Sequence, residues 1–125
     1  WDRACELYAQ LTGTIVDYGE AHSRECGHSR YGRDYTGRAT MGTPWNLESP
    51  LNFVGHSFGG ETIRLLASLL AYGNETEMNA AKNNCSELFK GGHEREYIRL
   101  PPLLHRITVQ RFQIMCPMLL PRHSL

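Results

Sequence analysis

Hydrophobic residues recur at three- and four-residue spacing in two parts of the chain, which predicts two amphipathic helices. The first covers residues 2–11, with Asp2 placed to cap it. The second begins after residue 57, and because its apolar face is wide we expect it to be well buried. That face is formed by Ile63, Leu65, Leu66, Ala67, Leu69 and Leu70. Gly73 is placed to end this helix, and residues 75–83 predict a further, more exposed one.

Two short apolar runs predict strands. Residues 14–16 are mostly β-branched, and Leu51, Phe53 and Val54 form a second run. Between these runs, residues 17–42 are polar and rich in glycine, and they lack the period of either a helix or a strand. A long unpatterned stretch inside a compact domain usually serves a function or needs an anchor of its own, such as a metal ion.

Residues 55–59 read Gly-His-Ser-Phe-Gly and fit the G-x-S-x-G nucleophile elbow, which requires a buried strand, a sharp turn and a helix. Such a turn would expose the hydroxyl of Ser57 above the positive end of the helix. It would also aim the backbone N–H of Phe58 at the place where an oxyanion forms. Glycine at 55 and 59 would avoid collisions with the neighbouring strand and helix. The alternative is an ordinary glycine-rich loop with a buried serine.

The size and charge of the chain narrow the choice of function. Its 125 residues suffice for one small domain but not for a complete α/β-hydrolase sheet. A formal net charge of zero gives no sign of nucleic-acid binding, and no apolar run reaches the length of a membrane span. The chain opens on Trp1 without an initiator methionine or a signal peptide. We therefore expect it to be part of a longer protein.

Residues 98–125 differ in composition from the rest of the chain. They contain four arginines, four prolines and no acidic residue. Prolines break long elements, so we expect a single strand at 107–114 and otherwise a divergent basic, proline-rich tail. A frameshifted reading or an alternative exon would produce such a tail.

Several segments of residues 1–97 agree, in order, with one known family. They are WDRACELYAQ at 1–10, VDYG at 16–19 with AH at 21–22, GHSRYG at 27–32, the elbow with TIRLL at 62–66, and ELFKGG at 87–92. With these segments the chain resembles the secreted staphylococcal-type and thermophilic Bacillus-type triacylglycerol lipases. The resemblance implies an α/β class with a partial α/β-hydrolase fold and an incomplete sheet. It makes residues 1–97 a lipase domain, with 17–42 as a zinc-binding-type loop and 51–73 as the elbow strand, turn and helix.

The same resemblance implies roles for five residues. Ser57 matches the catalytic nucleophile, and Phe58 matches the residue whose backbone N–H lines the oxyanion hole. Asp2, His22 and His28 match three of the four zinc ligands of the family. Zinc prefers four nitrogen, sulfur or carboxylate ligands in structural sites. Without the resemblance, scattered surface histidines would be the simpler interpretation of these positions.

Cys26 lies between the two histidines and has two interpretations. It could be a free or packed thiol, or it could compete as a metal ligand. Two N-glycosylation sequons, at Asn74 and Asn84, would become informative only in a secreted protein.

The catalytic acid and base are not identifiable in this sequence. No aspartate follows Asp34, and we expect His56 to support the turn and not to act as base. A substitute pair, Glu94 or Glu96 with His105 or His123, has the right order but leaves no room for the intervening elements.

We therefore predict a secreted carboxylester lipase fragment that carries the serine nucleophile. The intact enzyme would hydrolyse lipid or ester substrates through an acyl-enzyme and contact a lipid interface, while this chain would be inactive. The alternative is a truncated isoform or a degenerate paralogue, without catalysis, that acts as a metal-binding or interaction module.

Overall fold

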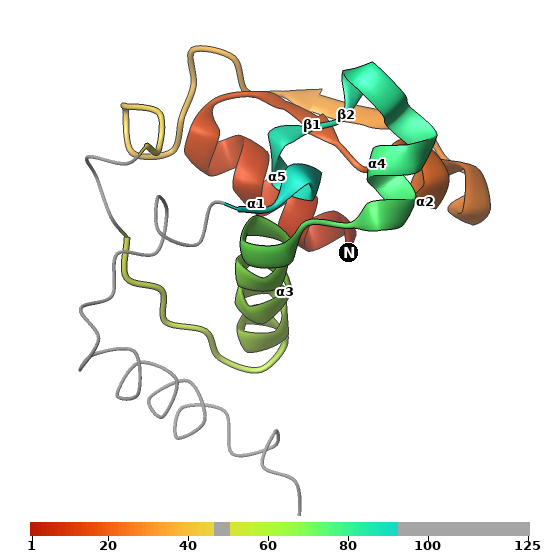
Figure 1. The fold of residues 1–125 in the computed structure, drawn as a ribbon. Helices are drawn as coiled ribbons and strands as arrows, with labels where there is room; N and C mark the ends of the chain where they lie inside the picture. The colour runs from red at the N-terminus through yellow and green to blue at the C-terminus, as the bar shows by residue number, and fades with distance from the viewer. Residues whose placement is uncertain (47–50, 93–125) are drawn as a thin grey trace, which may run out of the picture.

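A computed structural model describes residues 1–46 and 51–92 of the chain (Figure 1). Its elements follow in the order α1 Asp2–Thr12, β1 Ile15–Asp17, α2 Glu20–Cys26, β2 Tyr31–Asp34, α3 Phe58–Tyr72, α4 Glu75–Ala81, the 3₁₀ helix η1 Lys82–Asn84, and α5 Glu87–Lys90. The predicted basic tail, the strand at 107–114 and the substitute acid and base pairs lie outside the described residues.

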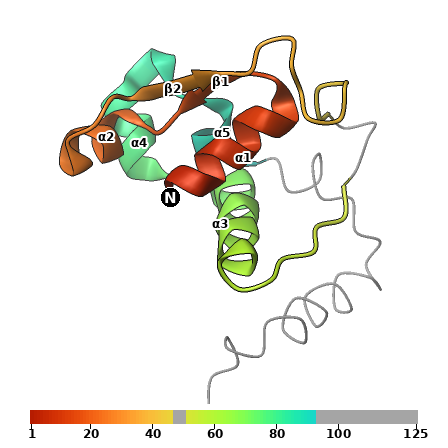
Figure 2. The same cartoon turned by 180° about the vertical axis from the view of Figure 1, so that it is seen from behind.

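The helices α1, α3 and α5 enclose the hydrophobic core. In Figures 1 and 2, α3 lies against one side of α1, and α5 packs against α3. The α1 and α3 segments form helices because their apolar residues repeat with the helical period, and burying those faces against each other removes them from water. The largest fully buried apolar side chains are Cys5, Val16, Leu66, Leu70, Leu88 and Phe89.

Two predicted helix details need correction. Asp2 does not cap α1, because Trp1 occupies the N-cap position and Asp2 lies in the first turn, where its carboxylate contacts His22. The helix after Gly73 is confirmed as α4 followed by η1, and Asn74 caps it by accepting a hydrogen bond from the backbone N–H of Glu77 at 3.0 Å. That helix is not exposed throughout, because Glu77 is 2% exposed.

The strand predictions were half right. The strand around residue 15 is confirmed as β1, which pairs with β2 in an antiparallel sheet with Ile15 opposite Asp34. The expectation that residues 17–42 lack regular structure is wrong, since α2 and β2 lie there. The strand expected around Phe53 is absent, and 51–56 form no strand. A strand needs a neighbour to hydrogen-bond with, and the described residues provide none beside this segment.

Arg30 fastens the segment between α2 and β2 to the rest of the molecule. Its guanidinium binds both carboxylate oxygens of Asp17 at 2.9 Å, and it donates to the carbonyl oxygen of Asn84 at 2.6 Å. The hydrogen bonds to Asp17 raise the pKa of Arg30 above its ordinary value. This bidentate pair is the strong form of ion pair. Together with the hydrogen bond to Asn84, it lets Arg30 link β1 to η1.

Candidate functional site

Ser57 lies at the start of α3 in an unusual backbone conformation. It is the N-cap residue of the helix, is exposed, and has φ 54° and ψ −128°. A positive φ is costly for a residue with a Cβ, by about 1–3 kcal/mol, and such strain tends to gather at functional sites. Lys82 also has a positive φ, but it is the C-cap of α4 and the first residue of the 3₁₀ helix η1, so it does not precede an α-helix as Ser57 does.

The two glycines of the motif differ in what they do. A Cβ at Gly55 would lie 2.6 Å from the backbone nitrogen of Gly60, so a side chain there would force the turn open. At Gly59 an added Cβ would meet nothing within 4 Å, which contradicts the expected collision. The reason is that no strand of the described residues lies beside Gly59.

Phe58 is the first residue of α3, and its side chain is 71% exposed. The N–H groups of Gly59 and Gly60 donate to the carbonyl oxygens of His56 and Ser57 at 3.0 Å each. The first N–H groups of a helix have no partner within the helix, and the helix dipole makes this end attractive to negative charge. Because the N–H groups of Gly59 and Gly60 are already bonded, it is the helix dipole that makes the start of α3 favourable to a negative charge beside Ser57.

The three residues proposed as zinc ligands come together at the other end of the molecule. His22 Nε2 lies 2.7 Å from one carboxylate oxygen of Asp2, and His28 Nε2 lies 3.8 Å from the other. The two imidazole rings meet edge to face, with centroids 5.3 Å apart. We call Asp2, His22, Cys26 and His28 the donor cluster.

Local structure explains why the donor cluster converges. His22 and Cys26 are four residues apart on α2 and so share one face of it. Gly27 ends the helix in the left-handed conformation, φ 73°, and turns the chain so that His28 comes back toward His22. The ring of Tyr18 stands edge-on to His28, with centroids 5.2 Å apart. Burial and a hydrogen bond to Glu6 raise the pKa of Tyr18 to about 12, so its hydroxyl stays protonated.

Two residues outside the cluster hold His22 in place. Trp1 stacks on its ring with centroids 5.2 Å apart. Glu77 reaches the start of α2, where its carboxylate accepts the backbone N–H of Ala21 at 2.9 Å and of His22 at 2.7 Å. Sequence analysis missed Glu77, since an acid in the first turn of a short helix gives no sign of being buried.

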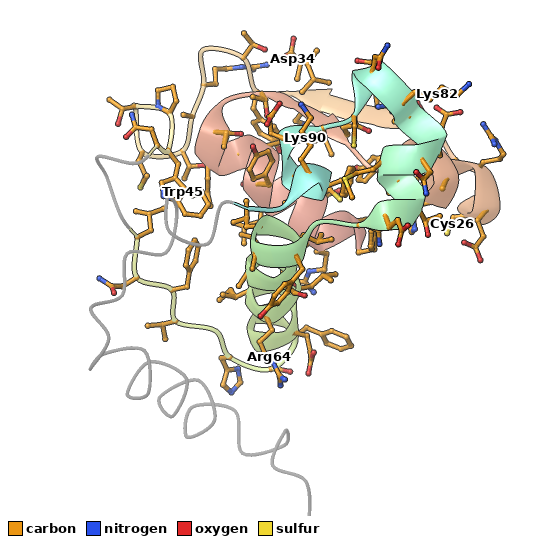
Figure 3. The ribbon with its side chains drawn as sticks, in the orientation of Figure 1. Cys26, Asp34, Trp45, Arg64, Lys82 and Lys90 are labelled. Carbon is orange, nitrogen blue, oxygen red and sulfur yellow. The ribbon has the colours of Figure 1, made fainter. Side chains whose placement is uncertain are left out.

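The donor cluster offers nitrogen, carboxylate and sulfur, the donor types that zinc prefers, so the residues present fit this metal. Cys26 and the start of α3 lie far apart. Figure 3 shows Cys26 at the end of α2, and Arg64, in the first half of α3, well away from it. The cluster and Ser57 are therefore separate sites.

Comparison with known proteins decides the family. The family model described as "Lipase-like, C-terminal domain" matches residues 1–100. The chain belongs to this lipase-like family. Among the described residues of this lipase-like chain, no helix combines the length and the apolar character that crossing a bilayer requires.

The lipase-like chain is similar to staphylococcal lipases in sequence. It is 46% identical over 96 residues to a lipase of Staphylococcus hyicus, and 44% identical over 97 residues to lipase 1 of Staphylococcus aureus. These matches cover 74% and 75% of this chain, but the chain spans 14% of the length of either relative.

Comparison with solved structures also finds proteins of this type. EstA from Clostridium botulinum matches with a TM-score of 0.65 and 50% identity, over 74% of this chain and 21% of that one. The crystal structure of Staphylococcus hyicus lipase matches with a TM-score of 0.61 and 47% identity, over 71% and 23%. The mixed helix and strand arrangement is thus that of a segment of a lipase fold.

Proposed function

We propose that this chain is the nucleophile-bearing segment of a secreted carboxylester lipase, with triacylglycerols or related esters as substrates. The observation that carries the proposal is Ser57, which is exposed and strained at the N-terminus of α3, inside a lipase-like sequence. The similarity to named lipases supports the choice of substrate class.

In the intact enzyme, Ser57 Oγ would attack the ester carbonyl carbon while a histidine takes its proton. The backbone N–H of Phe58 would stabilise the oxyanion, the alcohol would leave, and water would then release the carboxylic acid from the acyl-enzyme. The side chains of Val54 and Phe58, each 71% exposed, flank Ser57 and would meet the lipid or the remainder of the enzyme.

This chain alone should turn over esters poorly, because a serine without its base keeps only the contributions of the oxyanion hole and of binding. We also propose that Asp2, His22 and His28 build a structural zinc site. Bound zinc would cross-link the start of α1 to α2, and the residues would serve stability and not the ester chemistry.

A fluorophosphonate probe tests the nucleophile. In the intact enzyme, where a histidine can take the proton of Ser57, we expect stoichiometric labelling at Ser57 that disappears in Ser57→Ala. Ser86 is a matched control, since it is also a helix N-cap but has φ −58°, and Ser86→Ala should label normally. If folded protein, checked by circular dichroism, takes up no label, the alternative of a non-catalytic metal-binding or interaction module gains support.

A further inference from the structure

Residues 51–56 lead the chain to Ser57, and within the described part of the chain no strand pairs with them. Their exposure nevertheless alternates. Leu51 and Phe53 are partly buried and pack against the hydrophobic core, and Gly55 is buried, whereas the residues between them are exposed. The position of Ser57 therefore depends on the groups that hold the inward face of this segment.

Two contacts hold that inward face. Gly55 lies against α3, where a Cβ would come within 2.6 Å of the backbone nitrogen of Gly60, and this close approach shapes the turn itself. Phe53 meets the indole ring of Trp45 edge to face, with centroids 5.6 Å apart and an angle of 70° between the rings. Aromatic pairs prefer this arrangement and gain from it beyond the burial of their area. Trp45 therefore holds the segment shortly before it reaches Ser57.

Trp45 is itself fixed to the end of α1. Its side chain is buried in the hydrophobic core, and its backbone N–H donates to the carbonyl oxygen of Leu11 at 2.8 Å. Leu11 lies in the last turn of α1, where carbonyl groups have no partner within the helix. The backbone N–H of Thr40 donates to the neighbouring carbonyl oxygen of Gln10 at 2.9 Å. Trp45 thus gives Phe53 a packed support that moves with α1.

We propose that Trp45 is a positioning residue for the nucleophile and that it acts through Phe53. Its ring holds the segment that enters the turn, and the turn gives Ser57 its φ of 54°. A strained conformation persists only where its surroundings fix it. Misplacing a reacting group by about 1 Å can cost about 100-fold in rate. The inference rests on the proposed ester hydrolysis and adds to it a residue that works from a distance.

Steady-state hydrolysis of a short, water-soluble ester by the intact enzyme tests this role. Trp45→Leu removes the ring but keeps an apolar side chain, so kcat should fall about 10–100-fold while KM changes less than about twofold. Trp45→Phe keeps a ring for Phe53 and should restore most of the rate. Phe89→Leu is a matched control, because Phe89 is also a buried core ring but stacks on Trp1. It should lower the Tm and leave kcat unchanged.

A double variant tests whether Trp45 acts through Phe53. Phe53→Leu should lower kcat as Trp45→Leu does, and the double variant should be no slower than the slower single variant, since both remove the same contact. Phe53 is only partly buried, so Phe53→Leu also carries the test if Trp45→Leu does not fold.

Hydrogen exchange, measured by mass spectrometry on the peptide that contains residues 57–60, follows the turn without any need for activity. The N–H groups of Gly59 and Gly60 are hydrogen-bonded within this turn. Trp45→Leu should speed their exchange, because the turn would lose its support. Phe89→Leu should leave their exchange unchanged.

The outcomes separate this inference from the proposed function. Full kcat in Trp45→Leu, an equal loss in Phe89→Leu, or additive losses in the double variant would overturn the role of Trp45. If the unaltered enzyme neither hydrolyses esters nor labels at Ser57, the proposed ester hydrolysis fails instead. Hydrogen exchange would then still decide whether Trp45 holds the turn, and unchanged exchange in Trp45→Leu would overturn that as well.

Discussion

Glu77 gives the strongest stability prediction of this structure. Its side chain is 2% exposed, and its two carboxylate oxygens accept the N–H groups of Ala21 and His22. These N–H groups belong to the first turn of α2 and have no partner inside that helix. A single buried carboxylate therefore joins α4 to the start of the helix that carries His22.

The cost of removing the carboxylate follows from these contacts. A hydrogen bond to a charged group contributes about 1.5–3 kcal/mol. Glu77→Gln replaces one acceptor oxygen with an amide that can only donate, so it should lower the free energy of unfolding by about 1.5–3 kcal/mol. Glu77→Ala leaves both N–H groups unsatisfied, at about 1–3 kcal/mol each, so it should lower the free energy of unfolding by about 2–6 kcal/mol.

Urea unfolding, followed by circular dichroism and tryptophan fluorescence, measures these changes. Trp1 stacks on His22, so its emission also reports whether the start of α2 stays in place. Glu75→Gln is a matched control, because Glu75 lies in the same first turn of α4 but is exposed, and it should change stability by less than about 0.5 kcal/mol. Equal stability of the Glu77→Gln and Glu75→Gln proteins would refute the assigned role of Glu77.

Three further predictions use other parts of the chain. The natural chain should carry one zinc ion by elemental analysis, and the double variant His22→Ala, His28→Ala should carry none. Burial, aided by the Asp2 carboxylate, raises the pKa of the Cys5 thiol from 9.0 to about 12. The contribution of the buried Cys5 thiol to the free energy of unfolding should therefore be complete below pH 9 and be lost as the pH rises toward 12. At pH 9, folded protein should resist alkylation of Cys5 by iodoacetamide, whereas urea-unfolded protein should react. Gly55→Ala should destabilise by about 1–3 kcal/mol because its Cβ meets helix backbone, whereas Gly59→Ala should stabilise by about 0.4–1 kcal/mol in thermal melts.

Periodic helices were predictable from the sequence, and short elements were not. The apolar repeats of α1 and α3 extend over 11 and 15 residues, long enough to show the helical period. By contrast, α2 has 7 residues and buries Ser23 but no large apolar side chain. Its place in the fold depends on Glu77, more than fifty residues away, and no local pattern reveals that contact.

The apolar run before Ser57 shows a different limit. The apolar residues in 51–54 predict a strand, but they do not supply the strand that must pair with it. The candidate sites were easier to predict, because the sequence motif marked Ser57 and the family resemblance marked Asp2, His22 and His28. What the resemblance could not indicate is which nitrogen of His22 faces which donor, since that depends on side-chain packing.

The two proposed sites interact through packing and not through chemistry. The donor cluster fastens the first turn of α1, where Trp1 and Asp2 contact His22, to α2. The same helix packs against α3, which has Ser57 at its N-terminus. A metal ion in the cluster would therefore stabilise the surface on which α3 rests and would leave the backbone of Ser57 unchanged. In the proposed enzyme, the strained backbone of Ser57 would depend on a docked α3, which the proposed zinc site would help to stabilise.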